Sequence, residues 1–310
     1  MQIRKKHIPI FTSVTNDTME YLAVTVKSIS ENLVGDSVVD LRVLTSGLAT
    51  YNQRKLRHIK FHNIEVSVID VNSKVEDYRA DFEERLGYFY KEESFYPFFI
   101  ADMFPRLARC MYIECGTLVR DDVEKIYHTE IGDDLIGGVK ICDELEESLA
   151  PYREKWVGVD RERYIATSLM IINLSIFRKY RIAARFIRLL TGYNFDTVSC
   201  ASDYMNFLCK GRVRVLNEEW KIGDGGNDSV VIFPPYRLPW YHVDTEYADE
   251  FWETSRRTPF YDDVREAYFN FNEVKKEEER VNIERMLTHA DKLSKSDGGF
   301  YNVLGDNYLL

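Results

Sequence analysis

Apolar residues recur along the chain in short unbroken runs. Four runs have the length and composition of buried strands, and they span residues 7–11, 41–45, 64–70 and 110–114. The segments between them are long enough to hold helices, and apolar positions at helical spacing predict an amphipathic crossover helix over 19–33. Alternating strands and helices indicate an α/β protein with a mostly parallel sheet.

The middle of the chain continues this pattern less regularly. Residues 76–93 mix acids with aromatics and predict a helix and a loop over the sheet edge. The apolar run 168–177 predicts another central strand, with a helix after it over about 178–190.

The C-terminal part has a different composition. Three prolines in 233–240 exclude regular structure there, and the chain beyond is charged and helical, so we expect a boundary near residue 245. The expected domains are 1–245 and a helical C-terminal extension, 246–310. The predicted helix over 262–295 carries one apolar face. That face consists of Ile283, Met286, Leu287, Ala290 and Leu293. It is expected to pack on the rest of the chain, or on a protein partner or second copy.

Charge and hydropathy narrow the function classes. The 51 acidic and 41 basic residues give a net charge of −10, which argues against broad binding to nucleic acid or anionic lipid and leaves local basic clusters possible. No apolar run is long enough for a membrane helix, and the N-terminus has no signal peptide pattern. A cytoplasmic protein is therefore expected. The five cysteines include no C-x-x-C pair, so reduced, structural thiols are expected and a zinc site has no support.

The first candidate for chemistry is Glu114, which follows the apolar run 110–113. Ligands of open α/β sheets bind at the carboxyl ends of the strands, so a carboxylate at this place predicts a site. It could act as a lone metal ligand, a base or an acceptor for a sugar hydroxyl. The alternative is a carboxylate satisfied by backbone N–H groups of the following turn.

Five stretches in the order of a known family lie between residues 8 and 264. They are "IPIFTSVTNDTMEYLAVTVKSISENL", "FIADMFPRLARCMYIECGTLVRDDVEKIY", "RYIATSLMIINLSIFRKY", "SDYMNFLCKGRVRVLNEEWKI" and "FWETSRRTPFYDDV". The chain resembles the family 8 glycosyltransferases. The resemblance implies a GT-A fold, which is a Rossmann-like, mixed and mostly parallel sheet flanked by helices. It also implies hexosyl transfer from a nucleotide sugar with retention at the anomeric carbon.

In the family, an Asp-x-Asp pair and a later His hold the divalent cation that neutralises the leaving diphosphate. The resemblance places Glu114, Cys115 and Gly116 at the pair, and Ile232 at the His, before Leu238-Pro239-Trp240. Only the carboxylate of Glu114 is retained. No metal site is therefore expected by the family pattern, and Mn²⁺ or Mg²⁺ would need a rearranged site.

The remaining site positions are also implied by the resemblance. The nucleotide loop corresponds to Thr12, Ser13, Val14 and Asp17, and an arginine of the family aligns with Phe98. Other positions that the resemblance assigns to the donor pocket are Ala166, Thr167, Ser168, Asn206 and Trp240.

Asp203 is the last acid of an Asp-Gln-Asp motif and, with Glu114, is a candidate catalytic residue. Its alternative role is to cap the helix that it opens. Asp121 and Asp122 are read as a helix cap, and 223–229 as a turn or a phosphate or cation loop.

Two classes of function follow. The first is an atypical family 8-like glycosyltransferase that binds a nucleotide sugar and an unidentified glycan, lipid or protein acceptor, and for which the usual Mn²⁺ route is doubtful. The second is a non-catalytic pseudoenzyme that binds a carbohydrate or serves as a scaffold for a protein partner. The fold alone does not separate the two classes, because function depends on the site.

Overall fold

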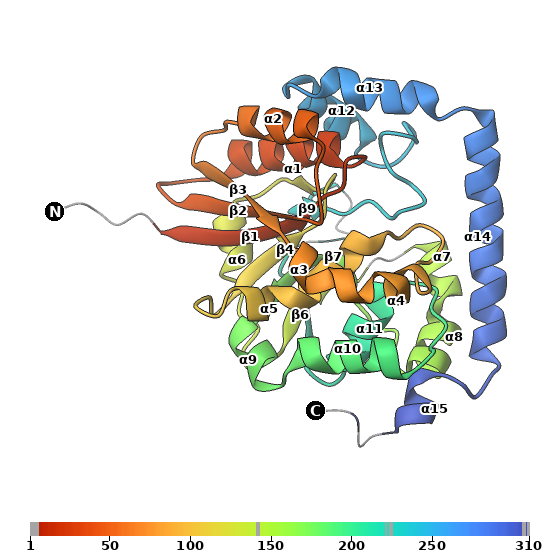
Figure 1. The fold of residues 1–310 in the computed structure, drawn as a ribbon. Coiled ribbons are helices and arrows are strands. Elements are labelled where there is room, and N and C mark those ends of the chain that lie inside the picture. Colours follow the sequence, from red (N-terminus) through yellow and green to blue (C-terminus); the bar gives the residue numbers. More distant parts are fainter. Residues whose placement is uncertain (1–5, 141–142, 221, 223–225, 306–307, 309–310) are drawn as a thin grey trace. The chain divides into compact units, whose positions relative to one another are not determined.

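The computed structural model describes residues 6–140, 143–220, 222, 226–305 and 308. Within them, seven strands form a mixed, mostly parallel sheet flanked by helices, which confirms the predicted fold class (Figure 1). The chain divides into two compact units. Unit 1 contains residues 1–73, 110–130 and 218–273, and unit 2 contains 74–109, 131–217 and 274–310.

Unit 1 contains four parallel strands in the order β3-β2-β1-β4. Ile10 of β1 pairs with both Leu41 of β2 and Met111 of β4, and all three side chains are buried. The elements of this unit are β1 (His7–Ser13), α1 (Met19–Asn32), β2 (Val38–Thr45), α2 (Thr50–His58), β3 (Ile64–Asp70), β4 (Cys110–Ile113), β5 (Leu118–Val119), α6 (Val123–Tyr127), β9 (Val230–Val231), α12 (Ala248–Arg256) and α13 (Tyr261–Asn270). The four predicted strands and the helix after the first are confirmed.

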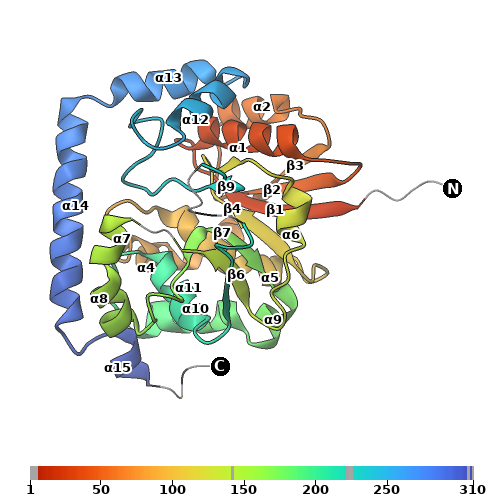
Figure 2. The same ribbon diagram turned by 180° about the vertical axis from the view of Figure 1, so that it is seen from behind.

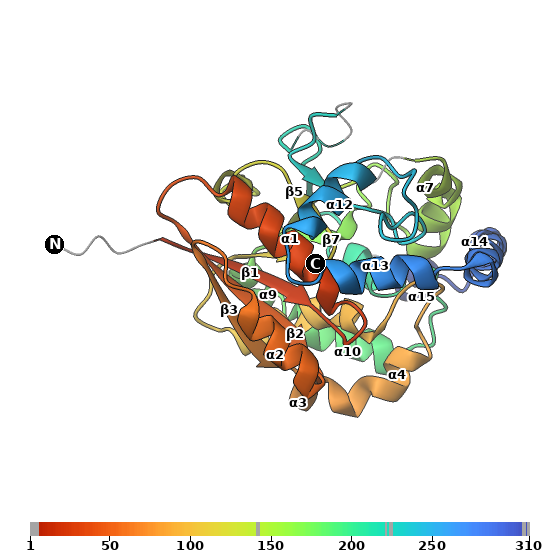
Figure 3. The same cartoon turned by 90° about the horizontal axis from the view of Figure 1, so that it is seen from above.

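Helix α1 connects the main sheet of unit 1 to a smaller layer. It contacts α12, α13 and β5, and β5 pairs with β9 in an antiparallel ladder (Figure 3). Tyr21 and Val24 of α1 belong to the apolar cluster that Leu118 and Phe251 complete. The helices that follow residue 245 thus pack on the first helix of the chain, so unit 1 extends past the predicted boundary to residue 273.

Unit 2 contains the strand order β7-β6-β8, in which β6 is antiparallel to β7 and parallel to β8. Its short helices are η1 (Glu76–Tyr78), α4 (Arg79–Glu83), η2 (Glu92–Phe99), α5 (Ile100–Met103), α7 (Glu144–Ser148), α8 (Ala150–Tyr152) and η3 (Arg153–Val157). The remaining elements are β6 (Ile136–Val139), β7 (Ala166–Ile172), α9 (Leu174–Lys179), α10 (Ile182–Gly192), α11 (Ala201–Leu208), β8 (Val213–Val215), α14 (Glu273–Ser294) and α15 (Phe300–Leu304). Helix α3 (Asn72–Val75) spans the division between the units.

Two predicted elements of this part differ from the structure. The apolar run 168–177 is not one strand, because β7 ends at Ile172 and the side chain of Asn173 accepts a hydrogen bond from the Ile176 N–H and caps α9. The helix predicted over 262–295 is two helices, α13 and α14, separated at residues 271–272. Of its apolar face, Met286, Ala290 and Leu293 are buried.

Helix α14 is held by a polar contact as well as by apolar packing. His289 lies between the hydroxyl of Tyr88, at 3.1 Å from Nδ1, and a carboxylate oxygen of Asp196, at 2.7 Å from Nε2. Helix α14 therefore packs on the rest of unit 2 through its second half, whereas its first turns are exposed.

Two further expectations from the sequence concern the cysteines and membrane-spanning helices. The four described cysteines are free, and Cys142 lies outside the described residues. Burial raises the pKa of the Cys200 thiol to about 12, which favours the thiol over the thiolate. Across the described residues, no helix has both the length and the apolar character that crossing a membrane requires.

Candidate functional site

The carboxyl ends of β1 and β4 lie at the same edge of the sheet in unit 1, because the two strands are parallel neighbours. Ser13 ends β1, and Glu114 directly follows β4. The Ser13 side chain is only 4% exposed, and its Oγ has no hydrogen-bond partner within the described part of the chain. A buried hydroxyl without a partner is uncommon, and it can bind a polar ligand atom. Glu114 is exposed.

The turn after Glu114 is fixed to its neighbours by specific contacts. The Cys115 thiol lies 3.3 Å from the Ser13 carbonyl oxygen and 3.5 Å from the Thr12 hydroxyl. The Gly116 N–H donates a hydrogen bond of 2.9 Å to the Thr25 hydroxyl of α1. The backbone of this turn is thereby held against both β1 and α1.

Gly116 lies directly under an aromatic ring. Its φ of +90° is in the left-handed region, which favours glycine. A Cβ atom at this position would lie 2.5 Å from Cζ3 and 2.7 Å from Cη2 of Trp240. The indole is 5% exposed and stacks on Tyr21 with 3.8 Å between ring centroids. A side chain at residue 116 and the indole cannot both occupy this space.

The other site positions of unit 1 form mostly apolar surroundings. Val14 is buried, Asp17 is exposed, and Ile232 is half-buried directly after β9. Cys115, Phe233 and Leu238 pack on the cluster around Trp240. Apolar side chains, those of Ile232 and Leu238, therefore lie where the family resemblance places a cation-binding His and a residue that follows it.

Asp203, on α11 in unit 2, is fully buried within a hydrogen-bond network. Its carboxylate accepts from the Tyr152 hydroxyl at 2.7 Å, the Tyr164 hydroxyl at 2.8 Å and the Ser199 N–H at 2.9 Å. Burial raises the pKa of the Asp203 carboxyl, although these hydrogen bonds oppose the shift. Tyr152 also accepts from the Val198 N–H, so the network joins α11 to the segments on either side.

The remaining positions of unit 2 are also engaged in internal contacts. The Asn206 amide binds both the N–H and the C=O of Ile165, each at 2.9 Å. The hydroxyls of Thr167 and Ser202 lie 2.6 Å apart, and Ala166 and Ser168 are half-buried at the start of β7. Phe98 is buried and stacks on Phe186 with 3.8 Å between ring centroids.

The predicted site residues are thus distributed over both units. Those of unit 1 are Thr12, Ser13, Val14, Asp17, Glu114, Cys115, Gly116, Ile232 and Trp240. Those of unit 2 are Phe98, Ala166, Thr167, Ser168, Asp203 and Asn206. Within unit 1 the structure brings the turn of Cys115 and Gly116 against Thr12 and Ser13 at the end of β1.

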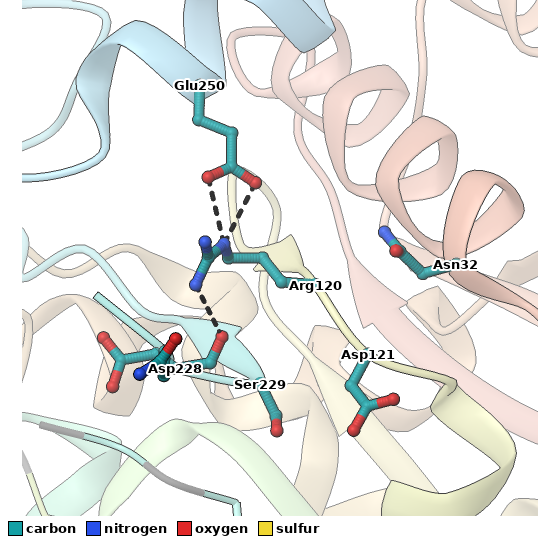
Figure 4. A pocket seen from close by; sticks show the side chains of 7 residues that line it. Asn32, Arg120, Asp121, Asp228, Ser229 and Glu250 are labelled. Carbon is teal, nitrogen blue, oxygen red and sulfur yellow. Dashed lines mark hydrogen bonds and ion pairs between the residues drawn. The ribbon is translucent and has the colours of Figure 1, made fainter. Parts of the chain in front are cut away.

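A separate pocket of about 370 Å³ opens in unit 1, and it is lined by Asp121 and by residues 227–229 of the segment for which the sequence predicted a turn or a phosphate or cation loop. Figure 4 shows Arg120 between Glu250 and Asp228. Arg120 Nε lies 3.0–3.1 Å from both carboxylate oxygens of Glu250, and its Nη1 donates to the Asp228 carbonyl oxygen at 2.9 Å. The arginine is therefore already neutralised. The pocket includes part of the segment 223–229, of which residues 223–225 lie outside the described residues.

The capping reading of the acids after β5 is confirmed. Asp122 is the N-cap of α6, and its side chain accepts a hydrogen bond of 3.0 Å from the Glu124 N–H. Asp121 accepts from the Asp122 N–H and pairs with Lys125. These two acids stabilise the start of a helix.

Comparison with known proteins assigns the family. The profile of glycosyl transferase family 8 matches residues 9–231, which is most of the chain, so this protein belongs to glycosyl transferase family 8. Among curated proteins, the chain is 22% identical over 194 residues to general stress protein A of Bacillus subtilis, covering 61% of this chain and 64% of that protein. It is 19% identical over 124 residues to a putative glycosyltransferase of Haemophilus influenzae, covering 40% of this chain and 37% of that protein.

Solved structures share the fold. The bifunctional glycosyltransferase WbbM superposes with a TM-score of 0.71 at 16% identity, over 87% of this chain and 53% of WbbM. The galactosyltransferase LgtC, solved with donor and acceptor sugar analogues, gives a TM-score of 0.61 at 18% identity, over 81% of this chain and 96% of LgtC. These likenesses establish a GT-A architecture for the chain.

The family implies a divalent cation, and the residues present can be compared with that requirement. Gly116 and Ile232 offer no side-chain ligand, and the indole of Trp240 fills the space beside Gly116. No three His, Cys, Asp or Glu side chains within the described ranges lie close enough together to hold a metal ion. The described residues therefore do not fit the cation site of the family.

Proposed function

We propose that this family 8 protein transfers a sugar from a nucleotide sugar without the divalent cation that the family uses. The observation that supports the proposal is the contact between Gly116 and Trp240. A carboxylate at residue 116 would need both a strained backbone and the removal of a buried indole. The acceptor is a glycan, a lipid or a protein.

The groups that would bind the donor lie at the edge formed by β1 and β4. The buried Ser13 hydroxyl, which has no partner within the described residues, donates to an oxygen of the donor. Glu114, exposed at the end of β4, accepts from a donor hydroxyl. Asp203 does not react in this proposal; it positions α11 through its three hydrogen bonds.

Calorimetric titration with nucleoside diphosphates and nucleotide sugars, each with Mn²⁺ and with a chelator, tests the proposal. We expect at least one nucleotide sugar to bind, with an affinity that Mn²⁺ and the chelator leave unchanged. Ser13→Ala should weaken that binding about tenfold, because one buried hydrogen bond is lost. Glu114→Gln should slow donor hydrolysis, whereas Glu65→Gln, at an exposed acid of β3, serves as the matched control. Binding that strengthens with Mn²⁺ would contradict cation independence.

The second candidate function is a non-catalytic pseudoenzyme, and the enclosure of Asp203 favours it. By the resemblance, this residue is the one acid retained from the Asp-Gln-Asp motif, and it is 0% exposed. If the folded protein binds no nucleotide or nucleotide sugar in the same titrations and hydrolyses none, the scaffold function replaces the transferase proposal.

A further inference from the structure

Unit 2 contains a local excess of positive charge in a chain whose net charge is −10. No Asp or Glu occurs between Glu162 and Asp196, and none occurs between Asp203 and Glu218. Nine Lys and Arg residues lie within these two acid-free stretches. A charge distribution this uneven creates a local positive potential despite the negative total.

The fold places six of these cations at the end of α9, at the N-cap and along one side of α10, and in the turn before β8. They are Lys179, Arg181, Arg185, Arg188, Lys210 and Arg212, and we call this set the basic face. Arg181, Arg185 and Arg188 lie at i, i+4 and i+7, so they follow one side of α10. The opposite side of α10, which includes Ile182, Phe186 and Leu189, is buried. Both Figure 1 and Figure 2 show α9, α10 and α15 along one edge of unit 2.

Within the described part of the chain, five cations of the basic face lie over tyrosine rings, and Arg212 in addition donates to the Asp133 carbonyl oxygen and lies near the Asp134 carboxylate. Arg185 and Arg188 lie over Tyr308, at 5.1 and 6.0 Å from the ring centroid. Lys179 and Arg212 lie over Tyr180, at 5.5 and 4.7 Å. Lys210 lies 4.3 Å from the centroid of Tyr301. Cation–π contacts leave the positive charge available to an external anion, whereas ion pairs would cancel it.

Exposed apolar groups adjoin these charges. On α15, Tyr301 is 37% exposed and Val303 is 50% exposed, and Tyr301 contacts Lys210. Segments that lie in a membrane interface have this composition, in which arginine and lysine lie beside tyrosine and an exposed aliphatic side chain. A surface for nucleic acid would need the cations but not the exposed valine.

We propose that the basic face, with Tyr301 and Val303 of α15, binds the surface of an anionic membrane. The cations contact lipid phosphates while the tyrosine rings and the valine enter the headgroup region. The partner is the membrane surface itself, and the inference does not depend on the proposed transferase activity.

Flotation of the full chain with lipid vesicles tests the proposal. One set of vesicles is pure phosphatidylcholine, and in the other a third of the lipid is phosphatidylglycerol. We expect binding to the anionic vesicles alone, which weakens as salt is added. The combined variant Lys179→Gln, Arg181→Gln and Arg188→Gln removes three exposed cations and should lower the partition constant about a hundredfold, at about fivefold per charge.

The matched control removes three exposed cations from unit 1. Arg54→Gln, Arg57→Gln and Lys60→Gln change the net charge equally, and this variant should bind within about threefold of the unmodified protein. Val303→Ser should also weaken vesicle binding, by about fivefold. Equal loss in both triple variants would overturn the assignment of the surface. Stronger binding to single-stranded RNA or duplex DNA than to anionic vesicles, unaffected by Val303→Ser, would overturn the assignment of the partner.

Discussion

The contact between Gly116 and Trp240 allows a quantitative prediction. A methyl group at residue 116 would lie 2.5 Å from Cζ3 of an indole that is itself stacked on Tyr21. Overpacking of this kind costs about 1–3 kcal/mol, because the ring must move out of its minimum. The left-handed φ of +90° adds about 1–2 kcal/mol for a residue with a Cβ atom. Gly116→Ala should therefore lower the free energy of unfolding by about 2–5 kcal/mol.

Gly35 provides a control with nearly the same φ angle. Its φ is +89°, and a Cβ atom there would meet no atom within 4 Å. Gly35→Ala therefore carries the same backbone strain, and the same entropic effect on the unfolded chain, without the steric conflict. The difference between the two variants isolates the cost of displacing the indole, which we expect to be about 1–3 kcal/mol.

Urea unfolding followed by circular dichroism measures both variants, and a double-mutant cycle extends the comparison. In a Trp240→Leu background the added methyl group should cost no more than at Gly35, because the ring has gone. If Gly116→Ala and Gly35→Ala destabilise the protein equally, the indole does not occupy this space. The proposal that a second carboxylate is excluded from residue 116 would then lose its basis.

Three further predictions concern buried or connecting side chains, and one concerns an exposed acid. Asp203→Asn should lower stability by about 1–3 kcal/mol, because an amide nitrogen must face a donor. Since burial raises the pKa of Asp203, the carboxyl keeps its proton to a higher pH in the folded state than in the unfolded state. The loss measured by urea unfolding should therefore be largest in acid and shrink as the pH rises above about 4; a loss that grows with pH would contradict this sign. Glu146→Gln leaves the buried guanidinium of Arg153 unpaired and should cost about 3–5 kcal/mol in the same assay; a loss below 1 kcal/mol would argue against the pair. His289→Ala should speed amide exchange in the second half of α14 and leave α10 unchanged; equal acceleration in both helices would indicate global destabilisation. Glu114→Ala should change stability by less than about 0.5 kcal/mol while donor hydrolysis falls; a large loss of stability would assign Glu114 a structural role.

Strands β1 and β4 of unit 1 could be predicted because they are buried on both faces, whereas β3, at the edge of the sheet, is only partly buried. Continuous apolar runs mark such strands, and all four predicted runs of unit 1 are strands. The run 168–177 is equally apolar but contains Asn173, whose side chain forms a helix cap that periodicity alone does not detect. The break between α13 and α14 was missed although the uncharged stretch 267–272, which contains two asparagines, interrupts the charged pattern at this place.

The contacts of the candidate site depend on long-range packing. Gly116 and Trp240 are far apart in the chain, and no local pattern indicates that an indole covers that glycine. The same holds for Arg120 and Glu250, which line the pocket. The resemblance to family 8 predicted which ligand side chains are replaced, but it did not indicate what occupies their space. The roles of Glu114 and Asp203 stay predictions.

The division into two discontinuous units affects how the chain folds during its synthesis. The chain passes from one unit to the other at residues 73–74, 109–110, 130–131, 217–218 and 273–274, so neither unit is a continuous segment. Strand β5 acquires its partner β9 only when residues 230–231 have been synthesised. The N-terminal half that emerges from the ribosome therefore exposes apolar surfaces whose packing partners are not yet synthesised, and neither unit can complete its core until late in synthesis. A truncation at residue 245 would remove α12 and α13 from their packing on α1 and is expected to yield an aggregating fragment.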